Sequence, residues 1–457
     1  MKKIIAIVLS LSLLTAAVGC GNKKSNKKEN SELTEIHIAK AAYHQELDSW
    51  NDDDEYGEEL RRIFAEIEGE CNIKISVDYY QPTEFVNTAR AAITGGDTSF
   101  ADIMISQLFT VGPMYAQELL FDLSKMSGLD INSELWNKEL TNVATFKNGS
   151  YGIGNAGLTG ANGMFMYYNK TLLNSLGIED PMKYVENGTW TWDKLRELAL
   201  KAIKDTNNDG KFTDADRYGC TSASYDGLVA TFLTCGIKTI AKDASGNLVY
   251  NLLGDDATKA FQKFKSIYTV NDGMFYAAGL DNSLQQHQFL SGKCLFMLGG
   301  WTSDENPADD VEICALPFPK YTVDQEYISP CFHNNSIITV PANVENPELV
   351  GKVITLLGEK TKDLGKALIE DASVEFSDRE KYVDTVTKYI SGKLAVDPCT
   401  IMINSNESIA IGTMEPLPRR YLPVKAVRNL FRQMHRQYRK YLTICLINKI
   451  YAPYFFV

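Results

Sequence analysis

The 457-residue chain is poor in histidine and carries no excess of positive charge, and both shortages narrow its possible functions. Its five histidines include no HExxH motif, and the sequence contains neither a GxSxG turn nor a phosphate-binding P-loop. Its formal net charge is −12, whereas a nucleic-acid partner usually requires a basic face. The sequence therefore predicts a protein that is not an enzyme and has no nucleic-acid partner.

The nine cysteines lack the spacing of a metal or redox site. No two of them form Cys-x-x-Cys, so neither a zinc knuckle nor a thioredoxin-type pair is visible. Several lie inside apolar runs, such as Cys294 and Cys314, and this favours buried free thiols over disulfides.

An apolar stretch at residues 4–14 follows Lys2 and Lys3 and is too short to span a bilayer as a mature helix. It predicts a secretory signal over residues 1–19. The end of this signal, Ala17-Val18-Gly19-Cys20, resembles a bacterial lipobox, which implies that Cys20 becomes a lipidated N-terminus anchored in the cell membrane. An ordinary signal peptide that ends near a cysteine is the alternative. Residues 20–34 are predicted to be a Lys-rich tether to the folded body.

The body begins with alternating strand and helix patterns. Period-two alternation predicts strands near 35–41 and 72–79, and a short apolar run predicts a third strand at 102–106. Helical spacing predicts helices over 55–71 and 83–94. This order implies a parallel sheet with helices on both faces, which binds ligands at the carboxyl ends of its strands. Ser106 and Gln107 directly follow the third strand and are therefore candidate ligand contacts.

A glycine-rich segment at 151–163 separates these patterns from a second set and predicts a flexible crossing between two lobes. It contains GxGxxG at Gly152–Gly157, but no helix pattern follows, which favours a hinge over a dinucleotide site. Thr191 is predicted to cap a helix over 192–204. The later strands and helices are expected at 164–169, 257–270, 283–291, 293–298, 313–318, 335–340 and 347–357.

Several short motifs stand in the order found in the extracellular solute-binding proteins of family 1, and the chain resembles that family over roughly residues 20–412. The motifs are Ala101–Ile103, Tyr167–Lys170, Thr189–Asp193, Phe289–Cys294, Leu316–Pro319 and Asn335–Pro341. The resemblance implies a two-lobed α/β fold of the periplasmic-binding-protein type II, with a hinge. It implies lobe 1 over 35–151 and 335–366, and lobe 2 over 159–330 and 367–412.

The same resemblance implies a function. The chain would be a monomeric receptor that binds a sugar or oligosaccharide by hinge closure and delivers it to the permease subunits of an ABC importer. Two alternatives stay open: a secreted carbohydrate-active enzyme, and a binding protein for a non-sugar solute such as a peptide.

Trp301 follows a predicted strand and two glycines, at the point where the family has a sugar-stacking tryptophan. A tryptophan that fills a lobe core is the alternative. Maltose-binding relatives have a tryptophan at the position of Ser106, so maltose-like specificity is in doubt. Asn162, Tyr225 and His44 are weaker candidates in loops near the expected cleft.

Residues 205–216 have the spacing of a structural calcium loop, with Gly210 at the sharp turn. An acidic surface loop that turns at Asn-Asp-Gly is the alternative. The predicted oxygen ligands are Asp205, Asn207, Asp209, the Lys211 carbonyl and Asp216.

The last segment, residues 413–457, differs in charge from the rest. From Glu415 to Val457 there are nine Lys or Arg and one acidic residue, and the apolar residues repeat with helical spacing. This pattern indicates a basic amphipathic helix that contacts a membrane or a partner. An altered, non-native chain end is the alternative.

Overall fold

The computed structural model describes most of the chain between residues 33 and 402. The described residues are 33–42, 50, 53, 55–146, 149–159, 163–222, 226–238, 240–242, 248–251, 254–269, 272–277, 282–299, 306–331, 335–373, 376 and 378–402. The predictions for the signal peptide, for Cys20 and for the segment 413–457 lie outside these residues. Within them, no helix is both long enough and apolar enough to cross a membrane.

The first lobe contains a four-stranded sheet in the order β13-β3-β1-β2. Strand β1 (Thr34–Ala41) pairs in parallel with β2 (Ile73–Tyr80) and β3 (Ile103–Gln107), and β13 (Ser336–Thr339) runs antiparallel to β3. Helices α1 (Glu55–Cys71) and α2 (Pro82–Gly95) connect the parallel strands. The strand–helix–strand order predicted for residues 35–106 is therefore confirmed.

Side chains of β1 alternate between two hydrophobic cores, as expected of a strand covered on both faces. Ile36 and Ile38 pack with α1 and α12 (Pro347–Thr361), whereas Ala39 and Ala41 pack with α2. The remaining first-lobe elements are η2 (Leu108–Thr110), α3 (Val111–Ala116), η3 (Leu123–Lys125), α4 (Lys138–Val143), β4 (Thr145–Phe146) and β5 (Gly149–Ser150).

The second lobe contains another four-stranded sheet, in the order β11-β6-β10-β7. Strand β10 (Cys294–Leu298) is parallel to β7 (Tyr218–Ser222) and antiparallel to β6 (Met166–Asn169), which is in turn antiparallel to β11 (Ile313–Leu316). Its other elements are α6 (Lys170–Ser175), α7 (Met182–Glu186), α8 (Trp192–Leu200), α9 (Asp226–Thr234), β8 (Ile240–Lys242), β9 (Leu248–Tyr250), α10 (Asp255–Lys265), α11 (Asn282–Leu290) and α14 (Arg379–Tyr389).

Helix α8 begins where the sequence predicts, because the Thr191 side chain accepts a hydrogen bond from the backbone N–H of Lys194. It ends at Leu200, four residues earlier than expected. The chain leaves the helix because Lys204 and Arg217 exchange two backbone hydrogen bonds of 3.0 Å. A cross-strand pairing that is distant in sequence thus overrides the local helical pattern.

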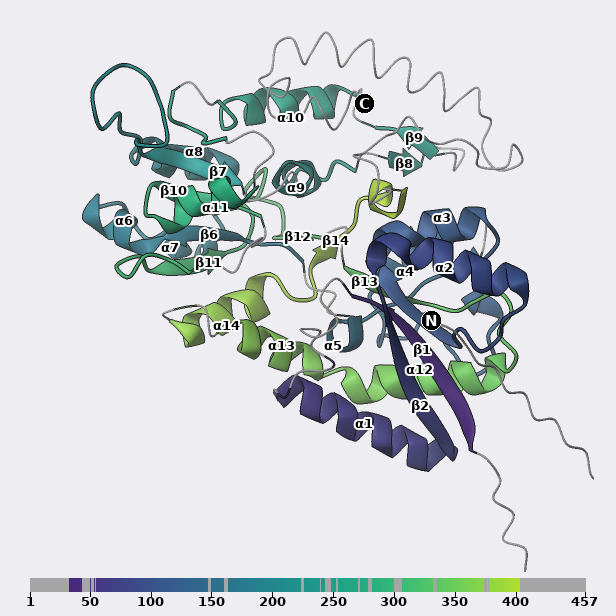
Figure 1. Cartoon of the computed structure of the whole chain (residues 1–457). Coiled ribbons are helices and arrows are strands. Elements are labelled where there is room, and N and C mark those ends of the chain that lie inside the picture. The colour runs from purple at the N-terminus through teal and green to yellow at the C-terminus, as the bar shows by residue number, and fades with distance from the viewer. Residues whose placement is uncertain are drawn as a thin grey trace, which may run out of the picture.

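Three chain segments run side by side between the two sheets, which lie in separate halves of Figure 1. Gly163 forms an antiparallel bridge with Cys331, and β12 (Ser329–Pro330) pairs in parallel with β14 (Leu394–Ala395). A Cβ atom on Gly163 would lie 1.9 Å from Ser329 Oγ, so glycine is required for this close approach. Helix α5 (Ala156–Thr159), just before the Gly163 segment in sequence, packs against α13 (Leu364–Ala372).

The end of the described chain departs from the expected lobe boundaries. The resemblance places 367–412 in the second lobe, but Leu394, Val396 and Ile401 pack in a first-lobe core. The chain turns back at Gly392, whose φ of 73° is in the left-handed region, and η5 (Pro398–Met402) then packs on η2 and α3. This reversal puts residues 394–402 on the first lobe.

Four cysteines of the described chain are buried free thiols, as their apolar surroundings predict. They are Cys220, Cys294, Cys314 and Cys331.

Candidate functional site

Gln107 lies at the carboxyl edge of the first-lobe sheet, as predicted for a ligand contact. It is the last residue of β3, and its side-chain Nε2 donates a 3.1 Å hydrogen bond to the carbonyl oxygen of Ala41, the last residue of β1. The side chain is 5% exposed, and its Oε1 has no hydrogen-bond partner. A buried carbonyl oxygen without a donor is costly, so this atom is suited to accept a ligand hydroxyl or N–H.

Ser106 occupies the same edge but offers less to a ligand. It is fully buried, and its Oγ lies 2.8 Å from Thr110 Oγ1. Because Thr110 donates its own hydroxyl proton to the Gln107 carbonyl, Ser106 must donate to Thr110. Ser106 therefore has no free proton for a ligand in this arrangement.

Four predicted contacts lie outside the described residues: Trp301, Asn162, Tyr225 and His44. Each one is nevertheless close in sequence to the carboxyl edge of a sheet. The chain passes from β1 to His44, from β7 to Tyr225, and from β10 through Gly299 to Trp301, while Asn162 shortly precedes β6. Gly299 has a φ of 94°, which a residue with a side chain rarely adopts.

Three buried glutamines on one helix of the second lobe were not predicted as part of the site. Gln285, Gln286 and Gln288 of α11 are each at most 2% exposed. Gln288 Nε2 donates to the carbonyls of Asp214 and Asp216, which precede β7, so the opposite end of α11 lies toward the carboxyl end of that strand. Gln285 is one turn nearer that end, and its Oε1 has no partner. A run of glutamines before an apolar strand is the sequence signal that could have identified this candidate.

In the predicted calcium loop, the first acidic residues fold back on the local backbone. Asp205 Oδ2 accepts from the N–H of Gly210, and Asp209 Oδ1 accepts from the N–H of Lys211, both at 2.8 Å. Asn207 Oδ1 accepts from the N–H of Asp209 at 3.1 Å. Asp205 Oδ1 is buried without a partner and is the atom of this loop best suited to a cation.

Asp216, the last predicted ligand of this loop, is held by two threonines. Its carboxylate accepts hydrogen bonds from the backbone N–H and the hydroxyl of both Thr206 and Thr213, at 2.8–3.1 Å. Among the described residues, no group of three or more His, Cys, Asp or Glu side chains lies close enough to hold a metal ion. Calcium binding by this loop therefore stays a prediction from the sequence spacing. If the loop binds calcium, adding calcium should raise the melting temperature of the wild type and leave that of Asp205→Asn unchanged.

We call these four hydrogen bonds to the Asp216 carboxylate the Asp216 clamp, and the clamp makes the stability of the folded chain depend on pH. The backbone N–H groups of Thr206 and Thr213 stabilise the charged carboxylate and lower the pKa of Asp216 to about 2. Because the folded-state pKa is depressed, this stabilisation is complete above pH ~4 and is lost as the pH falls toward 2. We expect Asp216→Asn to lower the melting temperature at pH 7 in EDTA, and the gap from wild type to shrink between pH 4 and 3. Asp214→Asn, at an exposed carboxylate next to the clamp, is the control; an equal loss in both variants would contradict the clamp.

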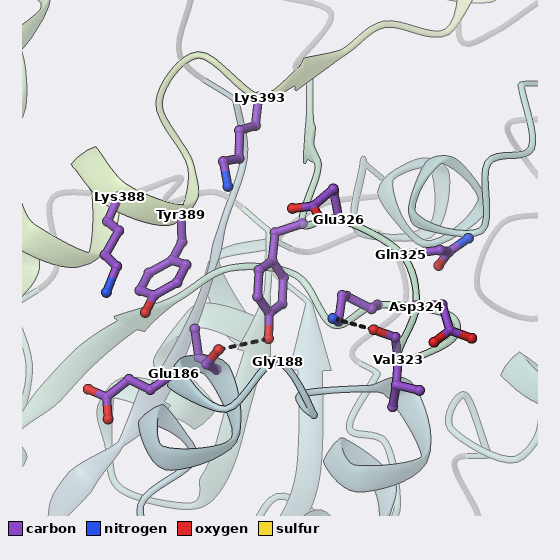
Figure 2. Close-up of a pocket in the computed structure, with 12 residues that line it drawn as sticks. Glu186, Gly188, Val323, Asp324, Gln325, Glu326, Lys388, Tyr389 and Lys393 are labelled. Carbon is purple, nitrogen blue, oxygen red and sulfur yellow. Dashed lines mark hydrogen bonds between the residues drawn. The ribbon is translucent and has the colours of Figure 1, made fainter.

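Figure 2 shows a separate pocket of about 460 Å³ on the second lobe, between α7, the 320–327 loop and the end of α14. Tyr327 and Tyr389 meet edge to face with ring centroids 5.8 Å apart. Lys320 Nζ donates to the Val323 carbonyl at 2.7 Å and lies 5.0 Å from the Tyr327 ring centre. None of the lining residues comes from the first-lobe sheet or its helices, so this pocket does not join the carboxyl edges of the two sheets.

Comparison with known protein families shows to which family this chain belongs. The family described as bacterial extracellular solute-binding protein matches residues 62–361, well over half of the chain. The chain belongs to this family. This solute-binding protein has no match among curated protein sequences.

Solved structures share the fold of this solute-binding protein. A cyclo/maltodextrin-binding protein complexed with maltotetraose has a TM-score of 0.57 and 15% identity, covering 90% of this chain and 99% of that one. A maltose-binding periplasmic protein from Listeria monocytogenes, in complex with maltose, has a TM-score of 0.53 and 14% identity, covering 90% and 99%. An ABC substrate-binding protein from the same organism, in complex with cycloalternan, has a TM-score of 0.52 and 14% identity, covering 89% and 99%. The expected two-lobed α/β fold is thereby confirmed.

Proposed function

We propose that this solute-binding protein is the sugar-binding receptor of an ABC importer, and that it closes on an oligosaccharide between its two lobes. The observation that carries the proposal is the amide of Gln107, whose buried Oε1 has no partner at the carboxyl edge of the first-lobe sheet. A neutral carbonyl oxygen suits a hydroxyl donor and disfavours an anionic ligand. The solved structures of the same fold named for cyclo/maltodextrin and maltose binding support the choice of ligand class.

Gln285 supplies a matching acceptor in the second lobe. Its Oε1 is also buried without a partner, toward the carboxyl end of β7. Acceptors on both lobes would be satisfied together only when a ligand with several hydroxyls lies between them. Closure is then a shift of population toward the state that binds the ligand better, with no bond chemistry.

The location in the cell follows in part from the family, whose members are extracellular. We propose in addition that Cys20 carries the lipid anchor, because the sequence before it resembles a lipobox. We also propose that the permease subunits bind the closed form of the protein. Intact-mass measurement of the membrane-extracted chain, with Cys20→Ser as control, tests the anchor: a mature N-terminus other than a lipidated Cys20 would reject it.

Binding of a sugar should raise the melting temperature. A ligand that binds only the folded state, present at 100 times its Kd, raises the free energy of unfolding by about 2.7 kcal/mol. We expect a shift with maltotetraose or another oligosaccharide in a thermal screen. Gln107→Leu should weaken binding of that ligand by about 1–3 kcal/mol, because a ligand hydroxyl that donates to Gln107 Oε1 would then be buried without an acceptor. Isothermal titration calorimetry measures the difference.

Gln325→Leu is the matched control. Its Oε1 accepts from the N–H of Tyr321 and Thr322 in a second-lobe loop, so its loss should affect stability and leave sugar affinity unchanged. No shift with any oligosaccharide, but a shift with peptides, would reject the sugar assignment. Conversion of the sugar at stoichiometric protein concentration would instead favour the secreted enzyme.

A further inference from the structure

A hairpin of the second lobe reaches across to the first lobe, away from the three crossing segments. It consists of Lys238 with β8 and β9, and we call it the interlobe strap. It is anchored in its own lobe by Ile237, which is 6% exposed in the second-lobe core. Strand β8 packs against η5, the short yellow helix just below it in Figure 1, and η5 belongs to the first-lobe core through Ile401.

One ion pair joins the strap to the first lobe within the described chain. Lys238 Nζ lies 2.8 Å from Glu139 Oε2, and the two side chains are 41% and 36% exposed. The two residues are 99 positions apart in sequence, with Glu139 in a first-lobe helix and Lys238 next to Ile237 of the second-lobe core. This pair is therefore a direct electrostatic link between lobes, outside the backbone that connects them.

Both ends of the link are held in place. Glu139 stands in the first turn of α4, where the Asn137 side chain caps the helix by accepting from the N–H of Glu139 and Leu140. On the strap, Asn251 Nδ2 donates to the Lys238 carbonyl at 3.2 Å and ties the two arms of the hairpin together. These contacts fix the backbone at both residues, so a rotation of one lobe against the other changes the distance that the ion pair must bridge.

We propose that the interlobe strap is a latch, in which the Lys238–Glu139 pair holds the lobes in the arrangement of this structure and biases the equilibrium between open and closed forms. A partly exposed ion pair changes such an equilibrium by a factor of about two to five. Salt should weaken the latch, because the Debye length falls from about 10 Å at 0.1 M to about 3 Å at 1 M. The latch acts on lobe geometry before any ligand binds, so it stands or falls independently of the sugar assignment.

Charge reversal tests the latch in the ligand-free, full-length chain. In low salt, Glu139→Lys and Lys238→Glu should each shift the radius of gyration measured by small-angle X-ray scattering in the same direction, and the double reversal should restore the wild-type value. Glu139→Gln, which is less disruptive, should give a smaller change in the same direction, and 1 M salt should remove all differences. Lys259→Glu is the control: it breaks an ion pair with Asp256 inside α10 and should leave the radius of gyration unchanged.

Two results would overturn the proposal. One is a radius of gyration that is the same in wild type and in all single variants at low salt. The other is a double reversal that keeps the shift in radius of gyration of the single variants, since the effect would then come from the individual charges and not from the pair.

Discussion

Gly157→Ala should destabilise the protein by about 1–3 kcal/mol or more, the usual cost of forcing an extra methyl group into a packed site. A Cβ atom on Gly157 would lie 1.7 Å from the carbonyl oxygen of Thr361, at the end of α12. That oxygen is backbone and cannot swing away as a flexible side chain would. The Gly157 carbonyl also accepts a 3.0 Å hydrogen bond from the buried hydroxyl of Tyr56, so relief by moving α5 would break this bond. Urea unfolding followed by circular dichroism measures the loss.

Gly69→Ala is the matched control for the same substitution. Gly69 lies inside α1, and nothing stands within 4 Å of the position its Cβ would occupy. Alanine is the better helix former by up to about 1 kcal/mol, so this variant should be as stable as wild type or slightly more stable. Equal stability of both variants would show that α5 and α12 do not pack backbone to backbone.

The parts of the fold that could be predicted are those whose pattern is local. Helix α1 has the predicted bounds because Leu60, Ile63 and Ile67 recur at helical spacing and are all buried. Strand β3 was recognisable from its short apolar run. The rule that ligands bind at the carboxyl ends of parallel strands then singled out Gln107 as a candidate, and its ligand contact stays a prediction.

The parts that could not be predicted depend on partners distant in sequence. The return of residues 394–402 to the first lobe rests on contacts of η5 with η2 and α3, about 290 positions earlier. Gln285 lies in a helix with no clear apolar face, and its burial depends on the sheet that α11 covers. No local period reveals either arrangement.

The loop at 205–216 shows how one pattern can serve two chemistries. The spacing of Asp205, Asn207 and Asp209 suits calcium, but the same side chains also form turns by accepting backbone N–H groups. What spacing does not show is that Thr206 and Thr213 bring four donors to Asp216. A carboxylate with that many donors is stable without a metal.

Trp192→Ala should cost about 3–5 kcal/mol, the usual loss when a fully buried tryptophan is truncated. Trp192 is 0% exposed in the second-lobe core, where its ring lies edge to face with Phe264 at 5.3 Å. Its Nε1 donates a 2.8 Å hydrogen bond to Thr234 Oγ1, which joins α8 to α9. Trp192→Phe keeps an aromatic ring and loses this bond, worth about 1 kcal/mol, so its stability should fall between the two.

Differential scanning calorimetry gives the sharpest readout for this residue. Leu200→Ala, on the same helix at a side chain that is 44% exposed, should stay within about 0.5 kcal/mol of wild type. Every core contact of Trp192 lies in the second lobe. If the two lobes unfold separately, Trp192→Ala should therefore lower the temperature of the second-lobe transition and leave the first-lobe transition unchanged. A shared shift of all transitions would mean that the crossing segments couple the lobes into one cooperative unit. An unchanged scan would contradict the burial of Trp192 itself.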